Sequence, residues 1–166
     1  LIFWIIFFEI AILYFCASTL LRCRIATPNI AWAAFALMLI GAVMNNVAVY
    51  QGGSSVMMTS YVPMMAAPSF YAGLILFAVG ALIARFVFFG TLVIAKRDKT
   101  YQGSVPLVTF GAITAAIIAV FTIASGAIIL IPTFLLSIGW ISAVDPLVYR
   151  TIGWAFGHSS QQINVA

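Results

Sequence analysis

Five long runs of apolar residues, separated by short polar segments, constrain this chain more than any other feature of its sequence. A membrane-spanning helix needs roughly 20 apolar residues to cross a hydrocarbon core about 30 Å thick. Strands of a membrane barrel are much shorter and alternate strictly between apolar and polar residues, which these runs do not. The pattern therefore predicts an all-α, polytopic transmembrane bundle that forms one domain over residues 1–166, with spans at about 1–21, 30–50, 69–95, 106–134 and 145–166.

Composition supports an integral membrane protein. Hydrophobic residues make up 65% of the chain and charged residues 6%, and the mean hydropathy is +1.22, far outside the range of soluble domains. The chain starts without Met, basic segment or cleavage site, so we expect no signal peptide, and both ends look cut. Cys16 and Cys23 are interpreted as packing residues.

The basic residues predict the orientation of the chain in the membrane. Loops 22–29 and 96–105 carry positive charges, whereas the 51–68 segment carries no charge. By the positive-inside rule, the two basic loops face the cytoplasm, and the last span runs from outside inward. We expect the lipid bilayer, and no nucleic acid, as a partner, because the clustered basic residues stand at helix ends and form no nucleic-acid-binding patch. These residues are Arg22, Arg24, Lys96, Arg97 and Lys99.

Proline and aspartate positions predict where the helices begin. A proline in the first turn of a helix costs no hydrogen bond, because that N–H has no partner in the helix. Asp145 is expected to cap the last helix, and Pro132 to kink or end the fourth. The four prolines expected at helix starts are Pro28, Pro68, Pro106 and Pro146.

Four polar side chains in the first three runs require an explanation, because polar groups at mid-membrane are costly unless they are paired or line a cavity. Glu9 is interpreted either as a proton-pathway group or as the partner of a group on another helix. Arg85 is expected to pair with Glu9 or with a cofactor carboxylate. For Asn45 and Asn46 we favour hydrogen bonds between helices.

The last run, "VDPLVYRTIGWAFGHSSQQINVA", contains the only histidine of the chain. A helix that begins at Asp145 places His158 roughly 20 Å further along its axis, within the membrane. Trp154, His158 and Gln162 share one face at a spacing of four residues, with Gln161 beside them. This stripe is typical of a buried pocket wall. The residues alone leave open whether His158 takes part in metal or proton chemistry or makes only a structural hydrogen bond, since one histidine cannot hold a metal.

The segment "DPLVYRTIGWAFGH" resembles the start of the sixth transmembrane helix of the catalytic subunit of heme-copper oxidoreductases, the cytochrome c oxidase subunit I-like proteins. The similarity is closest to the B-type oxidases. "TPN", "YVP", "FYAG" and "VPLVT" recur in the same order, so the resemblance covers about residues 25–158. It implies that the five spans correspond to helices two to six of a roughly twelve-helix respiratory-chain subunit in a prokaryotic cytoplasmic membrane.

The same resemblance implies cofactors and partners. His158 would ligate a non-heme iron or copper beside a high-spin heme, and Trp154 would pack the pocket. The low-spin heme ligand would fall just before Leu1, and the other heme and metal ligands beyond Ala166, outside this fragment. An electron-donor subunit, a cytochrome c, a cupredoxin or a quinol would supply electrons.

One departure from the family pattern bears on the substrate. Oxygen-reducing members generally have a proline after the histidine and a tyrosine four residues beyond it, whereas this chain has Ser159 and Gln162. A carboxamide cannot readily supply the electron and proton that a tyrosine gives. Nitric oxide reductases of the superfamily lack this tyrosine, so we favour an NO-reductase-like enzyme in which Gln162 hydrogen-bonds substrate or water. The alternatives are an O₂-reducing B-type oxidase and, in another class, a non-redox transporter or structural membrane subunit.

Overall fold

Helices occupy the positions that the apolar runs predicted. The computed structural model describes residues 2–56, 60–163 and 165, and over these residues it contains no strand. The all-α class is therefore confirmed. The helices are α1 (Ile2–Phe15), which continues as the π-helical segment η1 (Cys16–Leu20), α2 (Pro28–Tyr50), α3 (Pro68–Arg97), α4 (Leu107–Ser137) and α5 (Pro146–Gln162).

Four of the five predicted spans are long and apolar enough to cross a membrane in the described part of the chain. They cover Phe3–Leu20, Pro28–Tyr50, Pro68–Arg97 and Leu107–Ser137. The fifth helix, α5, has only 17 residues and ends at Gln162, short of the predicted end at residue 166. Its polar C-terminal residues make it less apolar than the other four helices.

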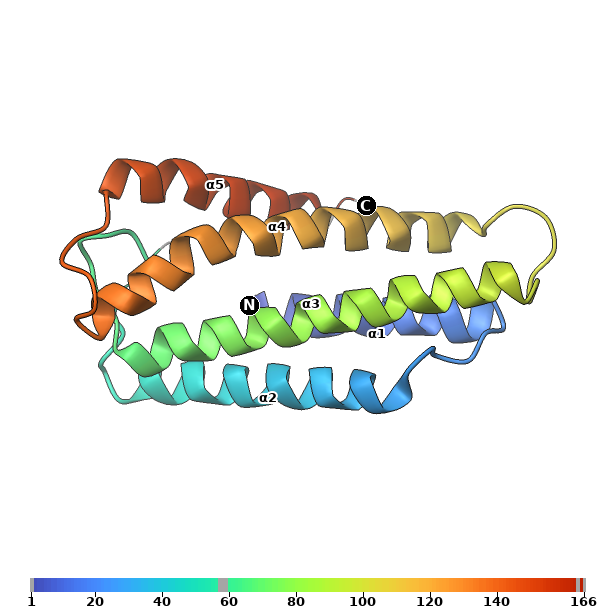
Figure 1. Ribbon diagram of the computed structural model, residues 1–166, viewed down its shortest axis with the longest axis horizontal. Coiled ribbons are helices and arrows are strands. Elements are labelled where there is room, and N and C mark those ends of the chain that lie inside the picture. The colour runs from blue at the N-terminus through green and yellow to red at the C-terminus, as the bar shows by residue number, and fades with distance from the viewer. Residues whose placement is uncertain (1, 57–59, 164, 166) are drawn as a thin grey trace.

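The helices lie side by side with their long axes nearly aligned (Figure 1). Helix α2 packs mainly against α3, α5 packs against α4, and α1 contacts both α3 and α4. Successive helices run in alternating directions, as expected of a bundle (Figure 1).

Glycines allow α2 and α3 to approach closely. A Cβ atom added to Gly41 would lie 2.5 Å from the backbone oxygen of Gly73, and one added to Gly80 would lie 2.6 Å from the oxygen of Ala34. Neither position can accept a side chain without moving backbone. Small residues at such contacts are typical of helix packing in membranes, where the gain comes from close van der Waals contact.

Helix ends follow the predicted signals with one difference, at Pro106. Pro28, Pro68 and Pro146 lie in the first turns of their helices, whereas Pro106 immediately precedes α4. Pro132 does not end α4, which continues to Ser137. Figure 1 shows α4 bending over its C-terminal part, as expected from the hydrogen bond that a proline removes.

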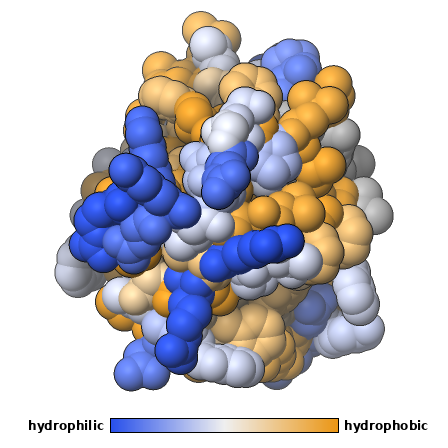
Figure 2. Space-filling view, turned by 90° about the vertical axis from the view of Figure 1, so that its right-hand side faces the viewer, coloured by the Kyte–Doolittle hydropathy of each residue, from blue (hydrophilic) through white to orange (hydrophobic). Residues whose placement is uncertain are grey.

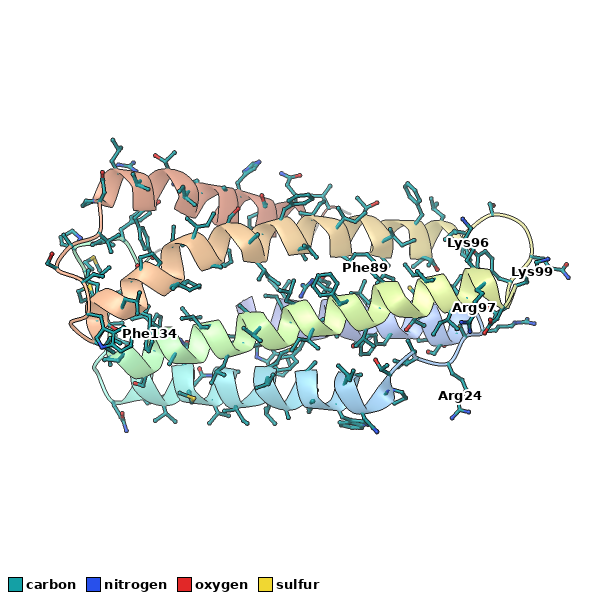
Figure 3. All side chains as sticks on the ribbon, in the orientation of Figure 1. Arg24, Phe89, Lys96, Arg97, Lys99 and Phe134 are labelled. Atoms are coloured by element: carbon teal, nitrogen blue, oxygen red, sulfur yellow. The ribbon has the colours of Figure 1, made fainter. Side chains whose placement is uncertain are left out.

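The two basic loops lie at the same end of the bundle. Figure 3 shows Arg24, Lys96, Arg97 and Lys99 at the end where α3 finishes, and Figure 2 shows hydrophilic side chains gathered there. Arg97 donates a hydrogen bond from Nε to Asp98 Oδ1 at 2.8 Å, which lowers the pKa of that carboxyl. The residues of these two basic loops therefore form a polar end of the bundle.

Candidate functional site

The stripe predicted on the last helix is present. Asp145 caps α5 as expected, because its Oδ1 accepts hydrogen bonds from the backbone N–H groups of Leu147 at 2.8 Å and Val148 at 3.3 Å. Cap and helix together place His158 and Gln162 on one face. Their Nε2 atoms lie 3.3 Å apart.

This face is exposed in the chain by itself: Trp154 is 52% exposed, and His158 and Gln162 are also exposed. The face is exposed because the opposite face of α5 packs on α4: a Cβ added to Gly126 of α4 would lie 2.8 Å from the ring of Phe156. That Trp154 packs a pocket stays a prediction.

The 3.3 Å contact joins the amide nitrogen of Gln162 to His158 Nε2, whose role as donor or acceptor depends on the tautomer of the ring. A ring nitrogen that carries a lone pair can ligate a metal. Gln162 thus contacts the atom through which His158 could hold a metal ion.

The described residues do not form a metal site by themselves. They contain no group of three or more histidine, cysteine, aspartate or glutamate side chains that could hold a metal ion. A single histidine such as His158 cannot hold a metal alone. Neighbouring Ser160 donates a hydrogen bond to the backbone oxygen of Gly157 at 2.7 Å, and Asn164, at the end of the polar run, lies outside the described residues.

Glu9 and Arg85 form a buried ion pair between α1 and α3. Arg85 Nη2 donates to Glu9 Oε2, and Arg85 Nη1 donates to the backbone oxygen of Ala81 at 2.9 Å. The side chains are 1% exposed for Arg85 and 9% for Glu9. Of the two partners considered for Arg85, the structure shows Glu9. Two polar atoms of the pair, Glu9 Oε1 and Arg85 Nε, have no hydrogen-bond partner among the described residues.

The two asparagines differ from one another. Asn45 Nδ2 donates to the backbone oxygen of Phe70 on α3 at 3.2 Å, which confirms the predicted bond between helices. The prediction was wrong for Asn46, whose Nδ2 donates to Ala42 on its own helix at 2.8 Å. A carbonyl one turn earlier is always within reach of a helical asparagine, so sequence could not separate the two.

The cysteines are free and buried, as expected of packing residues. Cys23 Sγ lies 3.8 Å from the backbone oxygen of Thr91. Burial, aided by the negative charge of Asp98, raises the pKa of the Cys23 thiol, which keeps it protonated and unreactive.

Sequence reasoning missed a groove between α1 and α4 that Glu9 lines. No pattern in the sequence predicts it, because a groove depends on which helices become neighbours and how closely they approach.

Comparisons with known proteins identify the family. The family model described as cytochrome c and quinol oxidase polypeptide I matches residues 1–165. A search of the curated proteins gave no match. A solved structure, reported as the cryo-EM structure of a heme-copper terminal oxidase dimer, is 27% identical in sequence, with a TM-score of 0.91. The match covers 99% of this chain and 28% of that chain. This multi-pass membrane chain therefore belongs to the cytochrome c and quinol oxidase polypeptide I family.

Proposed function

We propose that this chain is part of the catalytic subunit of a respiratory terminal oxidoreductase that reduces a small gaseous acceptor with electrons delivered through hemes. The family assignment supports this proposal over a transporter or a structural membrane subunit. The donor would be a partner subunit, a cytochrome c, a cupredoxin or a quinol. The resemblance to B-type oxidases would place the chain in a prokaryotic cytoplasmic membrane, with the basic loops on the cytoplasmic side.

The pair formed by His158 and Gln162 is the observation that carries the proposal. His158 would be one ligand of the non-heme metal, because its Nε2 offers a lone pair on an exposed helix face. The metal, when bound, supplies a binding site for the acceptor and an electron. Gln162, one turn further along the helix, would then turn its amide from the imidazole toward substrate or water.

Nitric oxide is the favoured acceptor because of the chemistry of Gln162. An amide can donate and accept hydrogen bonds, but it supplies neither an electron nor a proton readily. NO reduction needs no such donor at this position, whereas cleavage of the O–O bond does. Non-heme iron would suit the NO reaction. The second candidate is a B-type oxidase with copper in the site and its tyrosine elsewhere, since imidazole binds both metals.

The decisive experiment compares NO and O₂ consumption by the purified complete protein, with one electron donor and with metal analysis. Rapid NO reduction, slow O₂ reduction and iron in the non-heme site are expected. Copper in the non-heme site together with rapid O₂ reduction would support the B-type oxidase instead. A complete protein without a heme absorption spectrum would instead support the transporter or structural alternative.

A further inference from the structure

Helix α5 buries one side chain. Of its residues Pro146–Gln162, all of which the structure describes, only Tyr149 is buried, at 3% exposed. Helix α4 is the helix against which α5 packs. A helix that packs along one neighbour can rotate about its own axis unless a further contact fixes it. Tyr149 makes such a contact.

The first turn of α5 is joined to the loop between α2 and α3, which reaches the end of the bundle where α5 begins (Figure 1). The ring of Tyr149 meets the ring of Tyr61 edge to face, with centroids 6.4 Å apart. The guanidinium of Arg150 lies over the same Tyr61 ring, 5.9 Å from its centroid. Edge-to-face pairs and cations over aromatic rings both stabilise contacts between elements. Two consecutive residues of α5 therefore hold one tyrosine of the loop.

The loop is itself tied to α3. The backbone N–H of Ala66 donates to the hydroxyl of Tyr71 at 3.2 Å, and that of Ala67 donates to the backbone oxygen of Gly53 at 2.9 Å. Tyr71 is fully buried and belongs to the same apolar cluster as Tyr149. Through this loop, α5 is held against α3 as well as α4.

Tyr149 and His158 lie on opposite faces of α5. Nine residues separate them, which is about two and a half turns of a helix. Phe156 follows Tyr149 by about two turns, so it shares the buried face, where a Cβ added to Gly126 of α4 would lie 2.8 Å from its ring. The contacts of Tyr149 therefore determine the direction in which the opposite face, with His158, points.

A small rotation of α5 would matter at His158. The tip of a helical side chain lies about 5–6 Å from the axis, so a rotation of about 20° moves it by about 2 Å. Ligands of a metal ion keep their distances within about 0.2 Å. A displacement ten times larger than this tolerance would weaken binding through that ligand.

We propose that Tyr149 is a positioning residue for His158. Packed between Tyr61 and α4, its ring sets the rotation of α5 and with it the direction of the imidazole and of Gln162. The inference rests on the proposed function, in which His158 ligates a non-heme metal. Tyr149 acts through the helix, because it lies on the face opposite to that ligand.

Four variants of the complete protein test this role. Tyr149→Leu removes the ring, whereas Tyr149→Phe keeps it and removes only the hydroxyl. Tyr61→Leu removes the partner ring and leaves the sequence of α5 unchanged. Phe88→Leu, in a separate buried cluster, is the control for a general loss of packing. Competition with a chelator measures the affinity for the non-heme metal, and the low-spin heme spectrum reports whether each variant is folded.

We expect Tyr149→Leu and Tyr61→Leu to bind the metal about 10- to 100-fold more weakly than the parent, the range typical of residues that orient metal ligands. Tyr149→Phe and Phe88→Leu should bind it as the parent does. Unchanged affinity in Tyr61→Leu, or an equal loss in Phe88→Leu, would overturn the proposal. If Tyr149→Leu does not fold, Tyr61→Leu decides the question.

Two further measurements separate this inference from the proposed function. If His158→Ala retains the metal, the proposed function fails, and the positioning of a metal ligand fails with it. If His158→Ala loses the metal while Tyr61→Leu keeps it, only the positioning role fails. A density map of Tyr61→Leu shows the rotation of α5 without reference to the metal. An unchanged orientation of α5 in that map would contradict the proposal.

Discussion

Arg85 on α3 pairs with Glu9 on α1 across 76 residues of sequence, and both side chains are buried within the bundle. In a membrane such a pair fixes the position of one helix relative to another, because each charge is costly without the other. The adjacent Tyr14 hydroxyl donates to the backbone oxygen of Ala84 at 3.1 Å and adds a second link between the same helices. Helix α1 packs less extensively than α2 against α3. These polar links therefore add to the apolar contacts that Phe3 and Phe7 make with Phe77.

Removing one charge of this pair should destabilise the protein strongly. Glu9→Gln leaves Arg85 charged, buried and unpaired, a change that costs about 3–5 kcal/mol in comparable sites. Replacing both, by Glu9→Leu with Arg85→Met, should recover most of that loss. Unfolding in a denaturing detergent measures the difference. As a control, Asp98→Asn breaks the exposed pair with Arg97 and should leave stability unchanged; equal effects at both sites would contradict the role of burial.

Sequence predicted this contact only as one of several possibilities. Long apolar runs determine that helices form and roughly where they end, because the bilayer leaves backbone groups no other partners. Periodicity also places His158 and Gln162 on one face. Which faces meet depends on packing between helices, and apolar residues surround most of these helices. The pairing of Arg85, the exposure of Trp154 and the groove beside Glu9 therefore required the structure.

The close contact between α2 and α3 predicts an asymmetry among glycines. Gly41→Ala would place a methyl group 2.5 Å from the backbone oxygen of Gly73, so the helices must separate, at a cost of about 1–3 kcal/mol. Gly90→Ala meets no atom closer than 3.7 Å and should be neutral or slightly stabilising, because alanine favours helix more than glycine does. The unfolding midpoints of the two variants check this. A larger decrease of the midpoint for Gly90→Ala than for Gly41→Ala would contradict the close packing of α2 on α3.

The clustering of basic residues predicts the orientation in the membrane. In a cysteine-free background, Ser55→Cys in the uncharged loop should react with an impermeant reagent from outside intact cells. Ser104→Cys in the basic loop should react only after permeabilisation. Ser104 is preferred to Thr100 because the hydroxyl of Thr100 donates to the backbone oxygen of Leu21 at 2.6 Å. The opposite labelling pattern would show that the topology is inverted.

His158 should be required for the non-heme metal and not for the low-spin heme. His158→Ala removes the lone pair through which α5 could hold the metal, so metal content and turnover should fall below detection in the complete protein. The low-spin heme spectrum should remain, because its ligands are expected elsewhere. Trp154→Phe, one turn away on the same exposed face, is the matched control and should retain the metal. Equal metal content in the His158→Ala and parent proteins would show that His158 is not a ligand of the metal.

Gln162 provides the last prediction, which concerns the choice of acceptor. Its amide lies 3.3 Å from His158 Nε2, so it shares the surroundings of any metal held there. Gln162→Leu keeps the approximate size but removes the hydrogen bond, and NO turnover should fall about 10- to 100-fold while the metal is retained.

Gln162→Tyr should not create an oxidase by itself. A phenol restores one source of a proton and an electron, but redox potential and proton delivery depend on residues beyond α5. Rates of NO and O₂ consumption, measured with one donor for the parent and both variants, test this directly. If Gln162→Leu reduces NO as fast as the parent, the amide has no part in the reaction. If Gln162→Tyr gains rapid O₂ reduction, this single position decides the acceptor, and the rest of the site is already that of an oxidase.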